Sequence, residues 1–143
     1  MESLLYISRS NLPGEQGAAE VDRIVQLAQA RNRELEITGA LLFSGAHFAQ
    51  IIEGPATALN GLMNKIAADV RHKDLVMLQR SQITERTFAR WNMAYSGQSS
   101  YVDRHIRMLY HNVPATLKAE AVRNLLRLIH AMSEAESGAS GGG

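Results

Sequence analysis

The apolar residues of this chain alternate between two kinds of spacing, and the order of that alternation constrains the fold more than any other feature. Strand-like runs, each rich in apolar residues, occupy residues 4–8, 35–44, 47–53, 75–82 and 91–96. Apolar residues spaced three and four apart, as on one face of a helix, occupy residues 18–32 and 59–70. The second of these helices is expected to end near Arg71. The predicted order is strand, helix, strand, strand, helix, strand, strand.

This order predicts an α+β protein with a ferredoxin-like βαββαββ sheet. Right-handed crossovers in the two strand–helix–strand units place both helices on the same face of the sheet. Gly45 lies between the second and third strands and supplies the positive φ that a hairpin turn needs. Two more helices are predicted at residues 101–110 and 116–132. We expect them to cover the opposite face of the sheet or to meet a second subunit.

The last predicted helix carries more apolar residues than one narrow face needs. Val122 and Leu126 lie outside its main stripe, and we expect them to contact another copy or a partner. The alternative is burial of the helix under residues 101–110. The main stripe, expected on the sheet, is formed by Leu117, Ala121, Leu125, Leu128, Ile129 and Met132.

Composition and missing motifs exclude several functions. Fifteen Lys and Arg against 14 Asp and Glu give a net charge of +1, so neither nucleic acid nor a membrane surface is an expected partner. The chain has no cysteine, and its 5 histidines lack metal-binding spacing, so no metal site is predicted. Glycine-rich phosphate loops and a nucleophile elbow are absent. Without a membrane-spanning or secretory pattern, we expect a cytoplasmic protein.

Two polar residues stand inside apolar strands. Tyr6 lies within Leu-Leu-Tyr-Ile, and Gln50 lies within Phe-Ala-Gln-Ile-Ile. A buried phenol and a buried amide both need hydrogen-bond partners. Because the first and third strands are neighbours in this fold, the two side chains are expected within hydrogen-bond reach. The pair is either structural or functional.

Together with its surroundings, this pair resembles the signature of the BLUF family, blue-light sensors that use FAD. The resemblance covers about residues 3–97 in collinear order. Its motifs are Tyr6, Asn32, Ile37-Thr38-Gly39-Ala40-Leu41-Leu42, Phe48, Gln50, Glu53-Gly54-Pro55, Ile66, Asp69, Arg71, His72 and Trp91-Asn92-Met93.

The resemblance implies that FAD lies between the two helices with its polar edge toward the sheet. Asn32 is then expected to bond the ring edge, with Arg31 beside it. The expected apolar ring contacts are Ile24, Leu27, Phe48 and Ile66. The residues expected near the ribityl and phosphate end are Lys65, Asp69, Arg71 and His72.

The resemblance also implies a light-driven switch without catalytic turnover. Excited flavin takes an electron and a proton from Tyr6 through Gln50, and after recombination the Gln50 amide is left rearranged by rotation or tautomerisation. The amide suits this role because it has one donor and one acceptor end. Trp91 or Met93 is expected to approach Gln50 and carry the change across the sheet.

The resemblance therefore predicts a photoreceptor. We expect a flavin-binding domain at 1–97, a helical cap at 98–135 and a flexible tail at 136–143. Output is expected through a partner protein or self-association, with a homo-oligomer as the expected state. Two alternatives stay open: a flavin-binding redox protein and an acylphosphatase-like hydrolase on the same fold.

Overall fold

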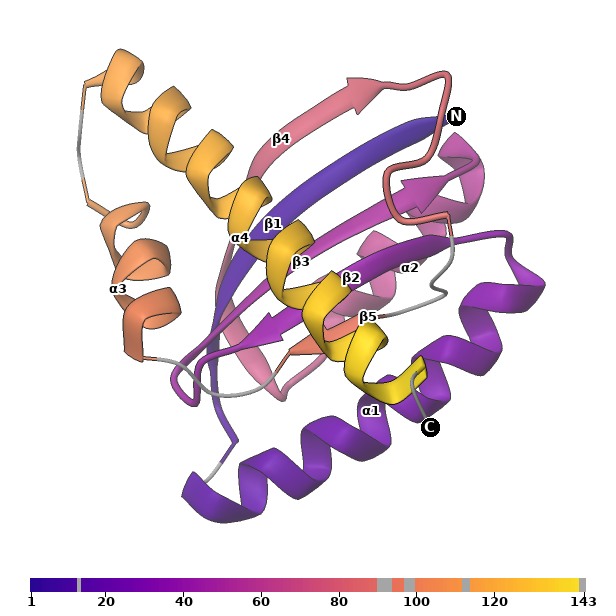
Figure 1. The fold of residues 1–143 in the computed structure, drawn as a ribbon, viewed down its shortest axis with the longest axis horizontal. Helices are drawn as coiled ribbons and strands as arrows, with labels where there is room; N and C mark the ends of the chain where they lie inside the picture. Colours follow the sequence, from indigo (N-terminus) through magenta and orange to yellow (C-terminus); the bar gives the residue numbers. More distant parts are fainter. Residues whose placement is uncertain (13, 90–93, 97–99, 112–113, 142–143) are drawn as a thin grey trace.

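The computed structural model describes residues 1–12, 14–89, 94–96, 100–111 and 114–141 (Figure 1). Its elements follow the predicted order, and the two C-terminal helices come last. They are β1 (Glu2–Ser10), α1 (Gly14–Glu34), β2 (Thr38–Phe43), β3 (His47–Gly54), α2 (Ala56–Ala68), β4 (His72–Gln82), β5 (Ala94–Ser96), α3 (Ser100–Met108) and α4 (Ala115–Gly141).

The strands form one sheet in the order β4-β1-β3-β2-β5. β1 pairs antiparallel with both β3 and β4, and β2 pairs antiparallel with β3 and parallel with β5. Gly45 has the predicted positive φ, 99°, in the β2–β3 turn. At Gly39 an added Cβ would lie 2.1 Å from the Ile51 carbonyl oxygen, so the close approach of β2 to β3 requires glycine there. The predicted ferredoxin-like α+β sheet is confirmed.

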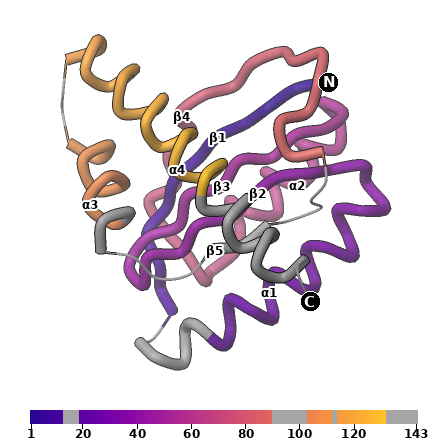
Figure 2. Tube along the Cα trace, viewed as in Figure 1, coloured from indigo at the N-terminus to yellow at the C-terminus, as the bar shows by residue number. Residues whose placement is uncertain are grey.

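Each face of the sheet has its own core, because neighbouring strand residues point to opposite faces. Leu4 belongs to the core beneath α1 and α2, whereas Leu5 belongs to the core beneath α3 and α4. In Figure 1, α4 crosses in front of the strands and α2 lies behind them. The Cα trace in Figure 2 shows the same two-sided arrangement. The predicted division of the helices between the two faces is confirmed.

The face that α4 turns toward the sheet differs from the predicted stripe. Leu125 and Ile129 are fully buried in the core, as expected. Leu117 is 56% exposed, and Val122 is buried in the chain's own core. Val122, Leu125 and Ile129 are spaced three and four apart and form the buried stripe, with Leu126 packed against it. The expectation that Val122 meets another molecule was therefore wrong.

Several predicted boundaries shift because local hydrogen bonds end the elements. α2 ends at Ala68 and not near Arg71, since Asp69 adopts an extended backbone and its N–H bonds the Ile66 carbonyl. β2 begins at Thr38, because Glu36 before it has a φ of 59°. α4 extends to Gly141, and the division of the chain into a flavin-binding domain, a helical cap and a tail stays a prediction.

No helix within the described ranges is long and apolar enough to span a lipid bilayer.

Candidate functional site

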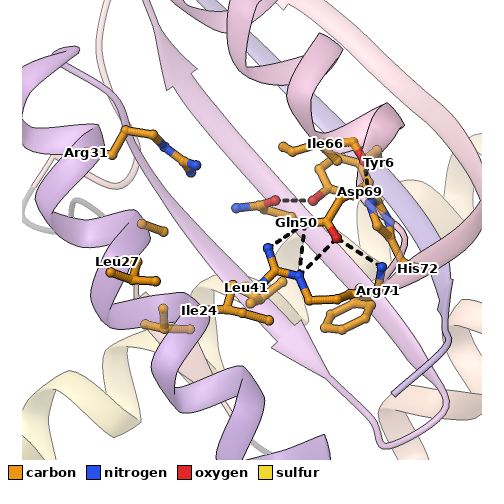
Figure 3. A pocket seen from close by; sticks show the side chains of 13 residues that line it. Tyr6, Ile24, Leu27, Arg31, Leu41, Gln50, Ile66, Asp69, Arg71 and His72 are labelled. Atoms are coloured by element: carbon orange, nitrogen blue, oxygen red, sulfur yellow. Dashed lines mark hydrogen bonds and ion pairs between the residues drawn. The ribbon is translucent and has the colours of Figure 1, made fainter.

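A cavity lies between α1, α2 and the sheet. Figure 3 shows side chains from α1 on one side, residues 66–72 on the other, and Gln50 and Leu41 of the sheet between them. The cavity is lined by Tyr6, Ile24, Val25, Leu27, Ala28, Arg31, Leu41, Phe48, Gln50, Ile66, Asp69, Arg71 and His72. Its walls are mostly aliphatic and aromatic, and its polar groups lie at the sheet and at the two helix ends. This arrangement suits a flat aromatic ligand with a polar edge.

Tyr6 and Gln50 form the polar floor of the cavity. The two residues are register partners in the β1–β3 ladder, so their side chains leave the same face of neighbouring strands. The Tyr6 hydroxyl donates a hydrogen bond to Gln50 Oε1, drawn dashed in Figure 3. Both residues are buried, and burial raises the pKa of the Tyr6 phenol, with the nearby Asp69 adding to the rise. The Tyr6 phenol therefore keeps its proton and can donate the hydrogen bond to Gln50.

Asp69 and Arg71 form a charged pair on the wall that follows α2. The Arg71 Nη2 lies 2.6 Å from Asp69 Oδ2, and Arg71 Nε donates to both carboxylate oxygens at 2.9 and 3.1 Å. These hydrogen bonds hold the pKa of Asp69 below its usual range, although partial burial opposes them. The carboxylate thus fixes the Arg71 guanidinium at the rim of the cavity.

His72 is held at the same rim as this pair. Its Nε2 lies 2.6 Å from the Ile66 carbonyl oxygen. Its ring centroid lies 6.4 Å from that of Tyr6 and 6.2 Å from that of Phe48. His72 therefore borders the aromatic floor.

Arg31 faces the cavity from α1. Within the described part of the chain its Nε is buried without a hydrogen-bond partner. Burial lowers the pKa of Arg31, and the positive charge of Arg71 lowers it further, while Tyr6 acts in the opposite direction. A buried N–H group without a partner can donate a hydrogen bond to an acceptor atom of a bound ligand.

These features fit FAD. Leu27 is 63% exposed and yet lines the cavity, so an apolar ligand surface would cover it. Gln50 and Tyr6 would offer an amide and a phenol to the polar edge of the ring, and Arg31 and Arg71 would offer cations to its carbonyl or phosphate oxygens.

Not all of the predicted site residues line this cavity. Asn32 is fully buried, Lys65 is exposed on α2, and neither is among the residues that line the cavity. Trp91 and Met93 lie outside the described residues. Val25, Ala28 and Leu41 line the cavity without having been predicted. Leu41 could have been found from the hairpin register, because it is the β2 partner of Gln50.

The fold and site define a ferredoxin-like domain with a ligand cavity between its two helices. A family model described as "Sensors of blue-light using FAD", the BLUF family, matches residues 1–94. The chain therefore belongs to the BLUF family, whose domains bind FAD as their chromophore.

Similar proteins agree with this assignment. The dark-state structure of BlrB, a BLUF protein, is 34% identical with a TM-score of 0.70 and covers 91% of this chain and 95% of its own. The photoactivated adenylate cyclase subunit beta of Euglena gracilis is 34% identical over 100 residues, 70% of this chain. The blue light- and temperature-regulated antirepressor BluF of Escherichia coli is 31% identical over 93 residues, 65% of this chain.

The matched part spans only 12% of the cyclase subunit and 23% of the antirepressor. It corresponds to the sensor domain alone, and nothing in these matches assigns a catalytic role to it. Because the family is one of light sensors, the redox-protein and hydrolase alternatives are not favoured.

Proposed function

We propose that FAD occupies the cavity between α1 and α2 and that the hydrogen bond between Tyr6 and Gln50 is the switch of this blue-light sensor. The observation that carries the proposal is the buried Tyr6–Gln50 pair in the floor of the cavity. Ile24, Leu27, Phe48 and Ile66 would pack on the ring, as the sequence predicted, and Arg31 and Arg71 would bind its oxygens.

Bound FAD would supply the absorption of blue light and an electron acceptor. Tyr6 carries the phenolic proton that would be transferred, and burial raises the pKa of this phenol, so the proton stays on Tyr6 in the dark. In this structure Gln50 Oε1 accepts the hydrogen bond that the Tyr6 hydroxyl donates. Rotation or tautomerisation of the Gln50 amide would exchange the donor and acceptor that it offers, without adding charge to the buried site.

Two other predicted residues would act from outside the cavity wall. Asn32, buried next to Arg31 in α1, would reach the ring edge after a local adjustment on binding. Lys65 would serve the phosphates only from the exposed side of α2, and for this reason we give Arg71 the larger role. Trp91 or Met93 would pass the change to the rest of the sheet.

The output would pass to an effector. The similar proteins include an adenylate cyclase subunit and an antirepressor, both named for control by light. By analogy, we propose a partner protein or self-association as the output of this chain.

The test is the absorption spectrum of the FAD-loaded protein before, during and after blue light. A light sensor of this kind gives a red shift that reverses in the dark without any reductant. A redox flavoprotein would instead bleach only when a reductant is supplied, and a hydrolase would be colourless. Failure of the spectrum to shift would refute the proposed function.

A further inference from the structure

The carboxylate of Glu53 at the end of β3 is buried and receives hydrogen bonds from a distant segment. The residue is 1% exposed. Its oxygens accept from the Thr87 backbone N–H at 2.7 Å and from the Phe88 backbone N–H at 2.8 Å. The Thr38 hydroxyl on the neighbouring strand donates at 3.2 Å. Three donors thus converge on one buried carboxylate, which offsets the cost of removing it from water.

Arg86, the residue before Thr87, makes further hydrogen bonds to the same region of the sheet. Its Nη1 donates to the Glu53 backbone carbonyl at 3.0 Å and to the Thr38 hydroxyl oxygen at 2.9 Å. Its Nη2 donates to the Glu36 carbonyl at 2.6 Å. The segment 86–88 is therefore bound to the start of β2 and the end of β3. Its backbone N–H groups donate to the Glu53 side chain, and the Arg86 side chain donates to Thr38 and to backbone carbonyls.

This attachment places Phe88 in the core under the C-terminal helices. Phe88 is 1% exposed and belongs to the same cluster as Leu125 and Ile129 of α4. Its ring centroid lies 5.6 Å from that of His130, also on α4. A displacement of the 87–88 backbone would move a large aromatic side chain within a close-packed core, and α4 would have to respond.

We propose that Glu53 is a positioning residue for the light response, because it ties the strand of the switch to the segment that leads toward the predicted output residues. Glu53 follows Gln50 by three residues, and Phe88 precedes Trp91 by three. The carboxylate joins these two short stretches of chain and also connects them, through Phe88, to α4. The inference rests on the proposed function of Gln50 but concerns a residue outside the cavity.

The decisive variant is Glu53→Gln. It keeps the size of the side chain but turns one acceptor into a donor, so one of the two backbone N–H groups loses its acceptor. We expect hydrogen exchange at the Thr87 or Phe88 amide to accelerate about tenfold or more in the dark. We also expect FAD and the red shift to be retained, and the rate of dark recovery to change about fivefold, because the stretch leading toward Trp91 is no longer held in place.

The matched control is Glu85→Gln, the same chemical change at an exposed carboxylate in the same loop. It should leave amide exchange and dark recovery within about twofold of the parent chain. If Glu53→Gln fails to fold, Arg86→Met provides the second test, since it removes the outer half of the connection and leaves the buried carboxylate in place. The same two readouts apply to it.

The results separate a positioning role from a merely structural one. Faster exchange together with an altered recovery rate, in Glu53→Gln but not in Glu85→Gln, supports the inference. Faster exchange with the recovery rate of the control overturns it, because Glu53 then only stabilises the loop. Unchanged exchange overturns it as well. Absence of any red shift in the parent chain refutes the proposed function instead, whereas the dark exchange data still decide whether Glu53 holds the loop.

Discussion

Tyr6 and Gln50 face each other across the neighbouring strands β1 and β3, and the phenol of Tyr6 donates to the amide oxygen of Gln50. A switch at this pair needs a backbone that stays in place and room beside the side chains. The β1–β3 pairing fixes the backbone of both residues, so neither backbone can shift without breaking hydrogen bonds of the sheet. The cavity above them is where the proposed exchange of the two ends of the amide would take place. A rigid frame around one reorientable group is what a two-state switch needs.

Tyr6→Phe should keep flavin binding and abolish the light response. The ring of phenylalanine fills the same volume, so the floor of the cavity is retained, but the hydroxyl that donates to Gln50 is gone. Flavin fluorescence should rise, since the proposed electron donor has been removed. Absorption and fluorescence under blue light provide the measurement. A full red shift in this variant would mean that another residue is the donor.

Arg31→Met should weaken flavin binding while leaving the fold intact. Arg31 Nε is a buried donor on the cavity wall without a partner among the described residues, so removal of the guanidinium would take away the hydrogen bond that we propose to the ligand. We expect the dissociation constant to rise about 10- to 100-fold, the cost of one charge-assisted hydrogen bond. A fluorescence titration with FAD measures it, with Arg33→Met, exposed two residues later, as the control. Equal affinities in the two variants would contradict this role.

Asp69→Asn should weaken the dependence of the free energy of unfolding on pH at acidic pH. Hydrogen bonds from Arg71 lower the folded-state pKa of Asp69, so its contribution is present above the unfolded pKa of about 4 and is lost as pH falls through the folded value. At pH 7 the variant should be less stable by about 0.5–1 kcal/mol, a small value because the pair is partly exposed. Urea unfolding from pH 7 to pH 3 tests this against Asp22→Asn. Parallel profiles for parent and variant would disprove it.

Leu125→Ala and Leu117→Ala should differ sharply in stability although both residues lie on α4. Leu125 is fully buried in the core under the sheet, so its truncation should cost about 2–5 kcal/mol. Leu117 is 56% exposed, and its truncation should stay within about 0.5 kcal/mol. Denaturant unfolding of the two variants checks the observed orientation of α4. Similar losses would favour the stripe that the sequence predicted.

The sequence predicted those features that depend on residues close together in the chain or on strand alternation. The order of elements, the two-sided division of the helices and the Tyr6–Gln50 contact all followed from periodicity and from the neighbour relations of the fold. The orientation of α4 about its own axis did not follow, because Val122 and Leu126 widen the apolar face of the helix beyond the stripe that contains Leu117, and packing then decides which part is buried.

Contacts between distant side chains and loop backbone were also beyond prediction. Glu53 was recognised only as part of a motif, since no pattern in the sequence indicates that its partners are the amides of Thr87 and Phe88. In the same way, the distance of Asn32 and Lys65 from the cavity wall depends on where α1 and α2 end and how they are turned. Such details are set by tertiary packing, which helical periodicity does not encode.

The most direct test of the central claim compares the light-minus-dark absorption spectra of the FAD-loaded parent chain and of Gln50→Leu. Leucine preserves the volume and the apolar surroundings of residue 50 but has no amide to reorganise. The account predicts a reversible red shift in the parent and none in the variant, with flavin bound in both. A normal red shift in Gln50→Leu would contradict the assignment of the switch to the Tyr6–Gln50 pair.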